Sequence, residues 1–292
     1  MKILVLTSGG DSPGMNMILA SLQREFKDNL FACVGGFKGL IEGNILPIDK
    51  FNPIMHEKEA GSCIKCSRCL EFKSSQGFEK GLVNAKNFDV VIVLGGNGSY
   101  TGCCRLNERG VRTIFIPATI DNDVAISEYS QGFDTAVKSC EMMIENIMPT
   151  MEAFNRCAIF EVMGRHSPKI AKALANNISY DYLILNKEDI DYKKITEIAR
   201  ENTKKRHASL IIIKERLIKL SSLIKNLSKI DQTVEYKGVV VGYVQRGTQP
   251  TKKDLKFARN FAQFAINLIK NSEKSGAIIY KNQNFDVLYT NL

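Results

Sequence analysis

Two glycine-rich stretches, each directly after a short apolar run, are suited to holding phosphate groups. They are SGGDSPG at residues 8–14 and LGGNGSYTG at residues 94–102. Glycine lets the backbone approach a ligand closely, and a helix that begins after such a turn directs its positive end at an anion. The first stretch is neither a P-loop nor a G-x-G-x-x-G motif, and a tight turn capped by Asp11 is the alternative there. Two such turns in one chain favour phosphate binding.

A third stretch, PATIDND at residues 117–123, places two carboxylates close together. Asp121 and Asp123 could supply a general base and a metal ligand, although an Asx-rich turn has the same composition. Two more stretches, EVMGRH and GYVQRG, set Arg165 and Arg246 beside a glycine. A guanidinium can pair with phosphate through two hydrogen bonds. A single arginine of this kind is more often part of a surface salt bridge, but two beside glycine turns indicate phosphate on both reactants.

Short β-rich segments that alternate with helical patterns are the elements that must position these turns. Several segments are apolar at consecutive positions, as strands buried on both faces are. In residues 134–148, by contrast, Val137, Cys140 and Ile144 share one helical face. This alternation predicts an α/β fold with mostly parallel sheets, in which ligands bind at the carboxyl ends of the strands. The predicted strands are residues 2–8, 90–96, 113–118, 157–163, 182–186, 209–215, 238–244 and 276–280.

Composition and charge restrict the class of protein. The 292 residues carry a formal net charge of +9, which attracts anions of any kind. Aromatic residues make up only 8% and tryptophan is absent, so nucleic acid is not an expected partner. The N-terminus is predicted to be a strand rather than a signal peptide, and no long uncharged apolar run follows. We therefore expect a cytoplasmic protein without a membrane partner, in which the eight cysteines are reduced thiols.

The order and spacing of these motifs resemble those of the bacterial ATP-dependent 6-phosphofructokinases. The resemblance runs from Lys2 to about residue 285, and the chain is short of the family pattern by about its last helix. It implies two similar three-layer α/β domains. Residues 1–132 plus 245–292 would bind the nucleotide, and residues 133–244 would bind the sugar phosphate. The motifs that carry the resemblance are SGGDSPGMN, GGNGSYTG, PATIDND, QGFDTA, EVMGR and GYVQRG.

The resemblance implies a glycolytic reaction, the transfer of a phosphoryl group from ATP to the 1-hydroxyl of fructose 6-phosphate. Asp121 would be the general base, and Asn97 and Asp123 would hold Mg²⁺. Gly10 would let the backbone approach ATP. The implied catalytic residues are Arg68, Thr119, Asp121, Asp123 and Arg165. The implied nucleotide-binding residues are Gly10, Arg68, Cys69, Gly96, Asn97, Gly98 and Ser99. The implied sugar-phosphate residues are Thr119, Ile120, Asp121, Arg156, Met163, Gly164, Arg165, Glu215, Lys237, Tyr243 and Arg246.

The resemblance also bears on the donor and on assembly. Relatives that use pyrophosphate tend to carry Asp where this chain has Gly98 and Lys where it has Ala118, so ATP is the expected donor. Family members are usually homotetramers. Arg156 and Lys237 would then reach the substrate from a neighbouring subunit.

Departures from the family pattern keep two alternatives open. Asn97 stands where the family has Asp, which predicts weaker Mg²⁺ binding. Lys237 and Tyr243 stand in place of Arg and His at the sugar phosphate. These changes allow a weakly active or inactive regulatory paralogue, which could join a mixed tetramer. The C-x₂-C-x₂-C spacing of Cys63, Cys66 and Cys69 allows a metal or iron–sulfur site instead.

Overall fold

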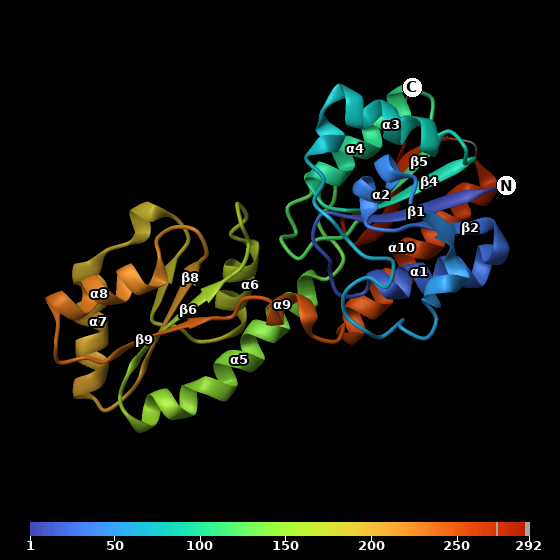
Figure 1. Cartoon of the computed structure of the whole chain (residues 1–292). Helices are drawn as coiled ribbons and strands as arrows, with labels where there is room; N and C mark the ends of the chain where they lie inside the picture. The colour runs from blue at the N-terminus through green and yellow to red at the C-terminus, as the bar shows by residue number, and fades with distance from the viewer. Residues whose placement is uncertain (273, 290–292) are drawn as a thin grey trace. The chain divides into compact units, whose positions relative to one another are not determined.

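The computed structural model describes residues 1–272 and 274–289, which form two compact units (Figure 1). The first unit runs from Met1 to Thr135 and resumes at Arg246, and the second is Ala136–Gln245. Each unit has its own sheet. Residue 273 and residues 290–292, which belong to the predicted nucleotide domain, lie outside the described residues.

The described part of the first unit contains a seven-stranded sheet in the order β11-β10-β5-β4-β1-β2-β3. Neighbouring strands from β10 to β2 run parallel, whereas β11 and β3 pair antiparallel at the two edges. The parallel neighbours β1, β4 and β5 therefore bring their carboxyl ends to the same edge. The strands are β1 (Ile3–Ser8), β2 (Leu30–Cys33), β3 (Ile45–Pro47), β4 (Val90–Gly95), β5 (Thr113–Pro117), β10 (Gly276–Lys281) and β11 (Asn284–Tyr289).

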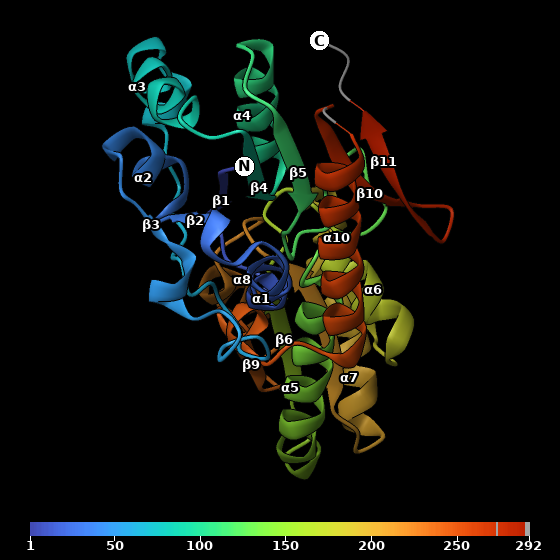
Figure 2. The same ribbon diagram turned by 90° about the vertical axis from the view of Figure 1, so that its right-hand side faces the viewer.

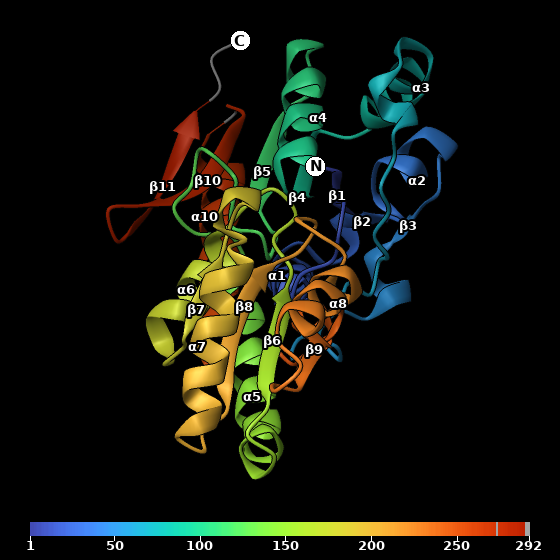
Figure 3. The ribbon, with the colours of Figure 1, turned by 90° about the vertical axis from the view of Figure 1, so that its left-hand side faces the viewer.

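Helices cover both faces of this sheet because its central strands are apolar on both sides. Ile3 and Val5 of β1 join one buried cluster with α1 and α10, and Leu4 and Leu6 join another with α2, α3 and α4 (Figures 2 and 3). The first unit is thus three layers thick. Its helices are α1 (Met15–Phe26), α2 (Gly36–Glu42), α3 (Ser75–Ala85), α4 (Asn97–Glu108) and α10 (Lys252–Asn271), with 3₁₀ turns η1 (Lys27–Asn29), η2 (Ile48–Phe51) and η3 (Glu71–Lys73).

The second unit is built on a smaller sheet of wholly parallel strands, in the order β7-β8-β6-β9. Apolar side chains of α7 and α8 pack with those of β6 and β8 in one buried cluster. Its strands are β6 (Cys157–Val162), β7 (Tyr182–Ile184), β8 (Ser209–Lys214) and β9 (Tyr236–Val240). Its helices are α6 (Lys169–Asn177), α7 (Tyr192–Lys204) and α8 (Leu220–Ile230), with the 3₁₀ turn η4 (Lys187–Asp189). Helices α5 (Phe133–Ala153) and α9 (Val244–Gly247) span the two junctions between the units.

The predicted two-domain α/β fold with mostly parallel sheets is confirmed. All eight predicted strands are present, but the strand predicted at 238–244 is β9, which ends at Val240. The backbone of Gly242 has a φ of 56°, a left-handed conformation that ends the strand before the short helix α9. The units are also less alike than expected, with seven strands against four among the described residues. None of the described helices is long and apolar enough to span a membrane.

Candidate functional site

The turns after β1, β4 and β5 are joined to one another by hydrogen bonds. Ser99 Oγ donates to the carbonyl oxygen of Ser8 at 3.1 Å. The main-chain N–H of Ala118 donates to the carbonyl oxygen of Gly95 at 2.9 Å. These bonds fix the glycine-rich turns and the PATIDND turn side by side at the carboxyl edge of the sheet, where an open α/β sheet binds its ligands.

Gly10 makes room for an arginine side chain. A Cβ atom at Gly10 would lie 2.6 Å from Nη1 of Arg246, and this nitrogen donates to the carbonyl oxygen of Asp11 at 2.7 Å. The guanidinium therefore lies directly over the first glycine turn. The missing side chain at Gly10, predicted to let the backbone approach a nucleotide, thus also brings Arg246 to the predicted nucleotide residues.

The PATIDND turn is fixed by its own polar groups. Asn122 adopts a left-handed φ of 46°, and its Oδ1 accepts a hydrogen bond from the N–H of Ser130 at 2.7 Å. Thr119 Oγ1 accepts from the N–H of Asp121 at 3.3 Å. The Asx-type turn and the site are thus the same structure, because Asn122 holds the loop that carries Asp121 and Asp123. No local pattern predicted this role of Asn122, although the residue stands between the two predicted acids.

Four predicted nucleotide residues follow β4, and they differ in what they can offer a ligand. Asn97 Nδ2 donates to the carbonyl oxygen of Asp123 at 3.1 Å, which brings these two predicted metal ligands together. A Cβ atom at Gly96 would lie 3.5 Å from Thr119, whereas one at Gly98 would meet open space. Ser99 is buried, its hydroxyl donates to the carbonyl oxygen of Ser8 at the end of β1, and its N–H donates to that of Gly96 within the turn. Ser99 therefore supports the turn and has no donor left for a nucleotide.

The loop that carries Arg68 and Cys69 adjoins the first glycine turn. The N–H of Gly9 donates to the carbonyl oxygen of Ser67 at 2.9 Å. Of the other residues predicted here, Ile120 has a fully buried side chain, so it can contact a ligand only through its main chain. The first unit thus gathers the predicted nucleotide residues and the predicted base at one edge.

Four predicted residues of the second unit, Met163, Gly164, Arg165 and Glu215, lie at the carboxyl ends of β6 and β8. Glu215 Oε1 accepts hydrogen bonds from the N–H groups of Gly164 at 3.2 Å and Arg165 at 2.7 Å. The N–H of Met163 donates to Gln245 Oε1 at 3.1 Å. These bonds fix the turn after β6, where Arg165 has a left-handed φ of 51°.

The remaining predicted residues of this unit lie along β9 and beside the start of β6. Arg156 and Lys237 both bond to Glu235, which sequence analysis missed. The only signal for Glu235 was its place two residues before Lys237, since side chains two residues apart in extended backbone point to the same side. Tyr243, after the end of β9, is 81% exposed.

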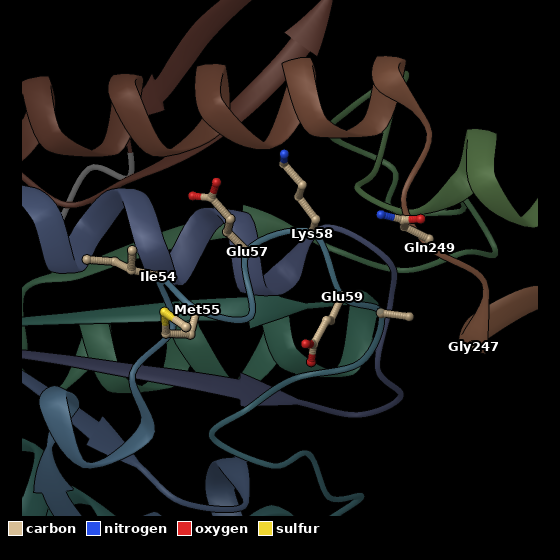
Figure 4. A pocket seen from close by; sticks show the side chains of 8 residues that line it. Ile54, Met55, Glu57, Lys58, Glu59, Gly247 and Gln249 are labelled. Atoms are coloured by element: carbon tan, nitrogen blue, oxygen red, sulfur yellow. The ribbon is translucent and has the colours of Figure 1, made fainter.

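A pocket of about 630 Å³ in the first unit contains none of these residues (Figure 4). It is lined in part by Ile54, Met55 and Gln249. Two of its acidic side chains are already paired, Glu57 with Arg24 and Glu59 with His56. We therefore place the candidate site at the strand edge.

Comparison with known proteins identifies the family. A family model described as phosphofructokinase matches residues 2–269. The chain belongs to the phosphofructokinase family. It is 34% identical over 290 residues to a protein from Clostridium tetani named ATP-dependent 6-phosphofructokinase, covering 97% of this chain and 90% of that protein. A protein of the same name from Paenibacillus macquariensis is 31% identical over 283 residues, covering 94% of this chain and 88% of that protein.

Solved structures support the same fold. The phosphofructokinase of Saccharomyces cerevisiae superimposes with a TM-score of 0.85 at 23% identity, over 98% of this chain and 44% of that chain. A pyrophosphate-dependent phosphofructokinase from Nitrosospira multiformis gives a TM-score of 0.81 at 17% identity, over 99% of this chain and 82% of that one. The predicted family and the predicted fold class are both confirmed.

The donor set at Asn97 and Asp123 fits the way proteins hold Mg²⁺. It offers one amide oxygen and one carboxylate. In residues 1–272 and 274–289, no group of three or more His, Cys, Asp and Glu side chains could enclose a metal ion. Mg²⁺ is usually held through one or two protein oxygens together with substrate phosphates and water, so a phosphofructokinase does not need a larger set.

The three closely spaced cysteines do not form a metal centre in the described part of the chain. Cys63 and Cys66 pack against the buried cluster on one face of the first sheet, and Cys69 packs against the cluster on the other face. Burial raises the pKa of the Cys63 thiol to about 11 and also raises that of Cys66. Among the described residues the three thiols therefore lie against clusters on opposite faces of the sheet and do not form one group of ligands.

Proposed function

We propose that this protein catalyses the ATP-dependent phosphorylation of fructose 6-phosphate at its 1-hydroxyl. The observation that carries the proposal is the meeting of three turns at one edge of the first sheet. The glycine turns after β1 and β4 offer close backbone approach, and the turn after β5 holds Asp121 beside them. Close approach to phosphates next to a carboxylate base suits phosphoryl transfer, in which positioning and charge stabilisation dominate.

The reaction is assigned to groups of the chain as follows. The oxygen of the sugar 1-hydroxyl attacks the γ-phosphorus of ATP, and the bond from that phosphorus to the oxygen of ADP breaks. Asp121 accepts the proton of the hydroxyl. Thr119, whose hydroxyl accepts the Asp121 N–H, would hold the turn that carries this carboxylate. Bound through Asn97 and Asp123, Mg²⁺ would neutralise charge on the ATP phosphates.

The first unit would hold the nucleotide and the second unit the sugar phosphate. Gly98 supports ATP as donor, since the space beside it is open and a longer side chain there would narrow it. In the second unit, Arg165, Glu215 and the main chain at Met163 and Gly164 would bind the sugar. Arg246, which the resemblance also assigns to the sugar phosphate, belongs to the first unit.

We also propose a cytoplasmic homotetramer in which a neighbouring copy supplies Arg156 and Lys237. Both cations are partly exposed in the chain and lie on neighbouring strand segments. The inactive regulatory paralogue is not favoured, because the sequence retains Asp121 and Asp123 and the two bacterial relatives described above are named ATP-dependent 6-phosphofructokinase.

The direct test is steady-state release of ADP by the purified protein with Mg²⁺, ATP and fructose 6-phosphate. We expect turnover of about 1 per second or more, the ordinary range for kinases. Pyrophosphate in place of ATP should give no product. Tight ATP binding without turnover would instead identify the regulatory paralogue, and pyrophosphate-dependent turnover would show that the assigned donor is wrong.

A further inference from the structure

Glu235 joins the two cations that the proposed function assigns to the sugar phosphate. Its Oε2 accepts from Arg156 Nε at 2.5 Å, and its Oε1 lies 2.6 Å from Lys237 Nζ. These contacts, above all the hydrogen bond from Arg156, hold the pKa of the Glu235 carboxyl below its usual value. The carboxylate is therefore ionised at neutral pH and lies between the two positive side chains.

The main chain fixes the partners of this contact. The N–H of Cys157 donates to the carbonyl oxygen of Glu235 at 3.0 Å, in the register that pairs β6 with β9. The carbonyl oxygen of Arg156 accepts from the N–H of Ser209 at 3.0 Å. Glu235 and Arg156 thus project from backbone segments that the sheet holds rigidly.

Phe154 restrains the same guanidinium from a second direction. The centre of the Arg156 guanidinium lies 4.1 Å from the centroid of the Phe154 ring, a cation–π distance. The ring is 61% exposed, so burial in the core does not explain its position in this chain. A flat guanidinium held by a ring face and by a carboxylate at Nε has lost most of its rotational freedom.

Comparison with another ion pair shows what this arrangement leaves available. In the first unit, Glu79 accepts from both Nη1 and Nη2 of Arg109, at 2.5 and 3.2 Å, and so occupies the fork of the guanidinium. Glu235 instead takes Nε. Within the described residues neither Nη atom of Arg156 has a hydrogen-bond partner. The two Nη donors remain open for a planar or tetrahedral anion.

We propose that Glu235 and Phe154 are positioning residues that present Arg156 and Lys237 to the phosphate of the sugar substrate. This inference rests on the proposed function, because that function supplies the phosphate. The arrangement restricts two long, flexible side chains before the ligand arrives, which lowers the entropic cost of binding. It matters most for Lys237, since an ammonium on a flexible stem lacks the fixed geometry of a guanidinium.

The opposite effect is physically possible and makes the inference testable. Glu235 carries a negative charge beside the proposed phosphate position, so it could compete with substrate for the two cations. Positioning predicts weaker substrate binding when the carboxylate is removed, whereas competition predicts tighter binding.

The experiment measures kcat and KM for fructose 6-phosphate in the full chain, at saturating Mg²⁺–ATP. In E235Q we expect KM to rise about tenfold, the scale of a lost charge-assisted hydrogen bond, with kcat changed less than about twofold. E235D, which keeps the charge on a shorter stem, should recover part of the loss. F154L should raise KM by a smaller factor, about threefold, because it removes only the cation–π contact.

E79Q is the matched control. Glu79 and Glu235 are similarly exposed, at 52% and 50%, and each contacts an arginine at 2.5 Å. E79Q should leave both kinetic constants unchanged, and a thermal unfolding scan should show that all variants are folded. A KM in E235Q that equals that of E79Q, or falls below that of the unmodified protein, would overturn the inference. A loss confined to kcat would overturn it too.

Failure of the proposed function gives a different pattern. If the unmodified protein does not phosphorylate fructose 6-phosphate, the assigned reaction is wrong. Calorimetric titration with inorganic phosphate then decides the inference alone. Binding at least fivefold weaker in E235Q than in E79Q supports it, and equal binding refutes it.

Discussion

The candidate ligand surfaces of the two units are held by different kinds of interaction. In the first unit, turns at the sheet edge are fixed by hydrogen bonds to main-chain oxygens, such as that from Ser99 to Ser8. In the second unit, the cations on Arg156 and Lys237 are fixed by a partly exposed carboxylate. The turns of the first surface are bonded to the main chain of the buried sheet, whereas the cations of the second surface are held by a side chain outside the core. Changes in the first should therefore cost geometry and stability, whereas changes in the second should cost affinity for charge.

The largest expected effect separates the two surfaces by kinetics. D121N removes the proposed base, so kcat should fall by roughly 10²–10⁴-fold with little change in KM for fructose 6-phosphate. K237A removes a proposed phosphate ligand of the second unit and should raise that KM about tenfold at nearly constant kcat. Initial-rate measurements with both substrates varied would check this. A fall of kcat in K237A as deep as in D121N would remove the distinction between the units.

Buried carboxylates extend the comparison to stability. Asp254 of the first unit is fully buried and accepts from Tyr129, Gly132 and Thr135, at 2.5–3.0 Å. Asp231 of the second unit is also buried, but its partner Arg200 is 43% exposed. Removal of Asp254 leaves buried hydrogen-bond donors without an acceptor. Removal of Asp231 leaves Arg200 unpaired, but its partly exposed guanidinium can hydrogen-bond to water.

D254A should therefore lower the free energy of unfolding by about 3 kcal/mol or more, because each unpaired buried donor costs about 1–3 kcal/mol. D231A should lower it by about 1–2 kcal/mol. Urea denaturation followed by circular dichroism would measure both. Equal losses in the two variants would show that the hydrogen bonds of Asp254 carry no special weight in the first unit.

The contact between Gly10 and Arg246 gives a smaller effect. In G10A the new methyl group would force the guanidinium away from its place, because their atoms would otherwise lie 2.6 Å apart. The arginine end can move, so stability should change little, while kcat/KM should fall about tenfold through the displaced charge. G247A is the matched control, since a Cβ at Gly247 would meet no atom within 4 Å. Wild-type kinetics in G10A would mean that Arg246 does not act from this position.

The sequence predicted well those features that depend on neighbouring residues. Buried parallel strands such as Val90–Gly95 are continuous apolar runs, and the turns that follow them carry glycine or Asx residues whose local chemistry is recognisable. Three of the described strands were missed. β2 is an apolar run, Leu30–Cys33, but it has only four residues. β3 has only three residues, and β11 at the sheet edge alternates polar and apolar positions. Short and edge strands bury too little apolar surface to be recognised locally.

Contacts between distant segments were not predictable in the same way. Arg246 reaches Gly10 across most of the chain, and Asp254 collects donors from residues more than 100 positions earlier. Such contacts depend on the packing of whole elements, which no local pattern encodes. The family resemblance supplied the identity of the candidate residues, but it did not predict that Ser99 is buried or that Glu235 lies between two cations.

Asn97 allows a test of how the first unit holds its metal. N97D would replace an amide that donates to the carbonyl oxygen of Asp123 with a second carboxylate. We expect the Mg²⁺ concentration for half-maximal rate to fall several-fold, because carboxylates bind hard cations better than amides do. The lost hydrogen bond should cost no more than about 1 kcal/mol in stability. Titration of the rate with Mg²⁺ at fixed ATP would measure it. An unchanged half-saturation point would place the metal away from Asn97.

The smallest expected effect is on the pH dependence of stability, through Glu161 in the second unit. Burial raises the pKa of Glu161 on β6 above its ordinary value of 4.5, and the nearby charge of Glu215 adds to the shift. The folded state therefore holds this proton more tightly than the unfolded state. Stability from this group is full below pH 4.5 and is lost as the pH rises through the raised pKa. In E161Q the thermal midpoint should decline less steeply with rising pH over that range.

E79Q again provides the matched control, because its effect has the opposite sign. The hydrogen bond from Arg109 lowers the pKa of Glu79, so the contribution of Glu79 disappears only as the pH falls below 4.5. Above pH 5 the slope for E79Q should match that of the unmodified protein. Parallel slopes for all three proteins would mean that Glu161 titrates at its ordinary pKa. The partly buried acid of the second unit would then be as well solvated as the exposed acid of the first.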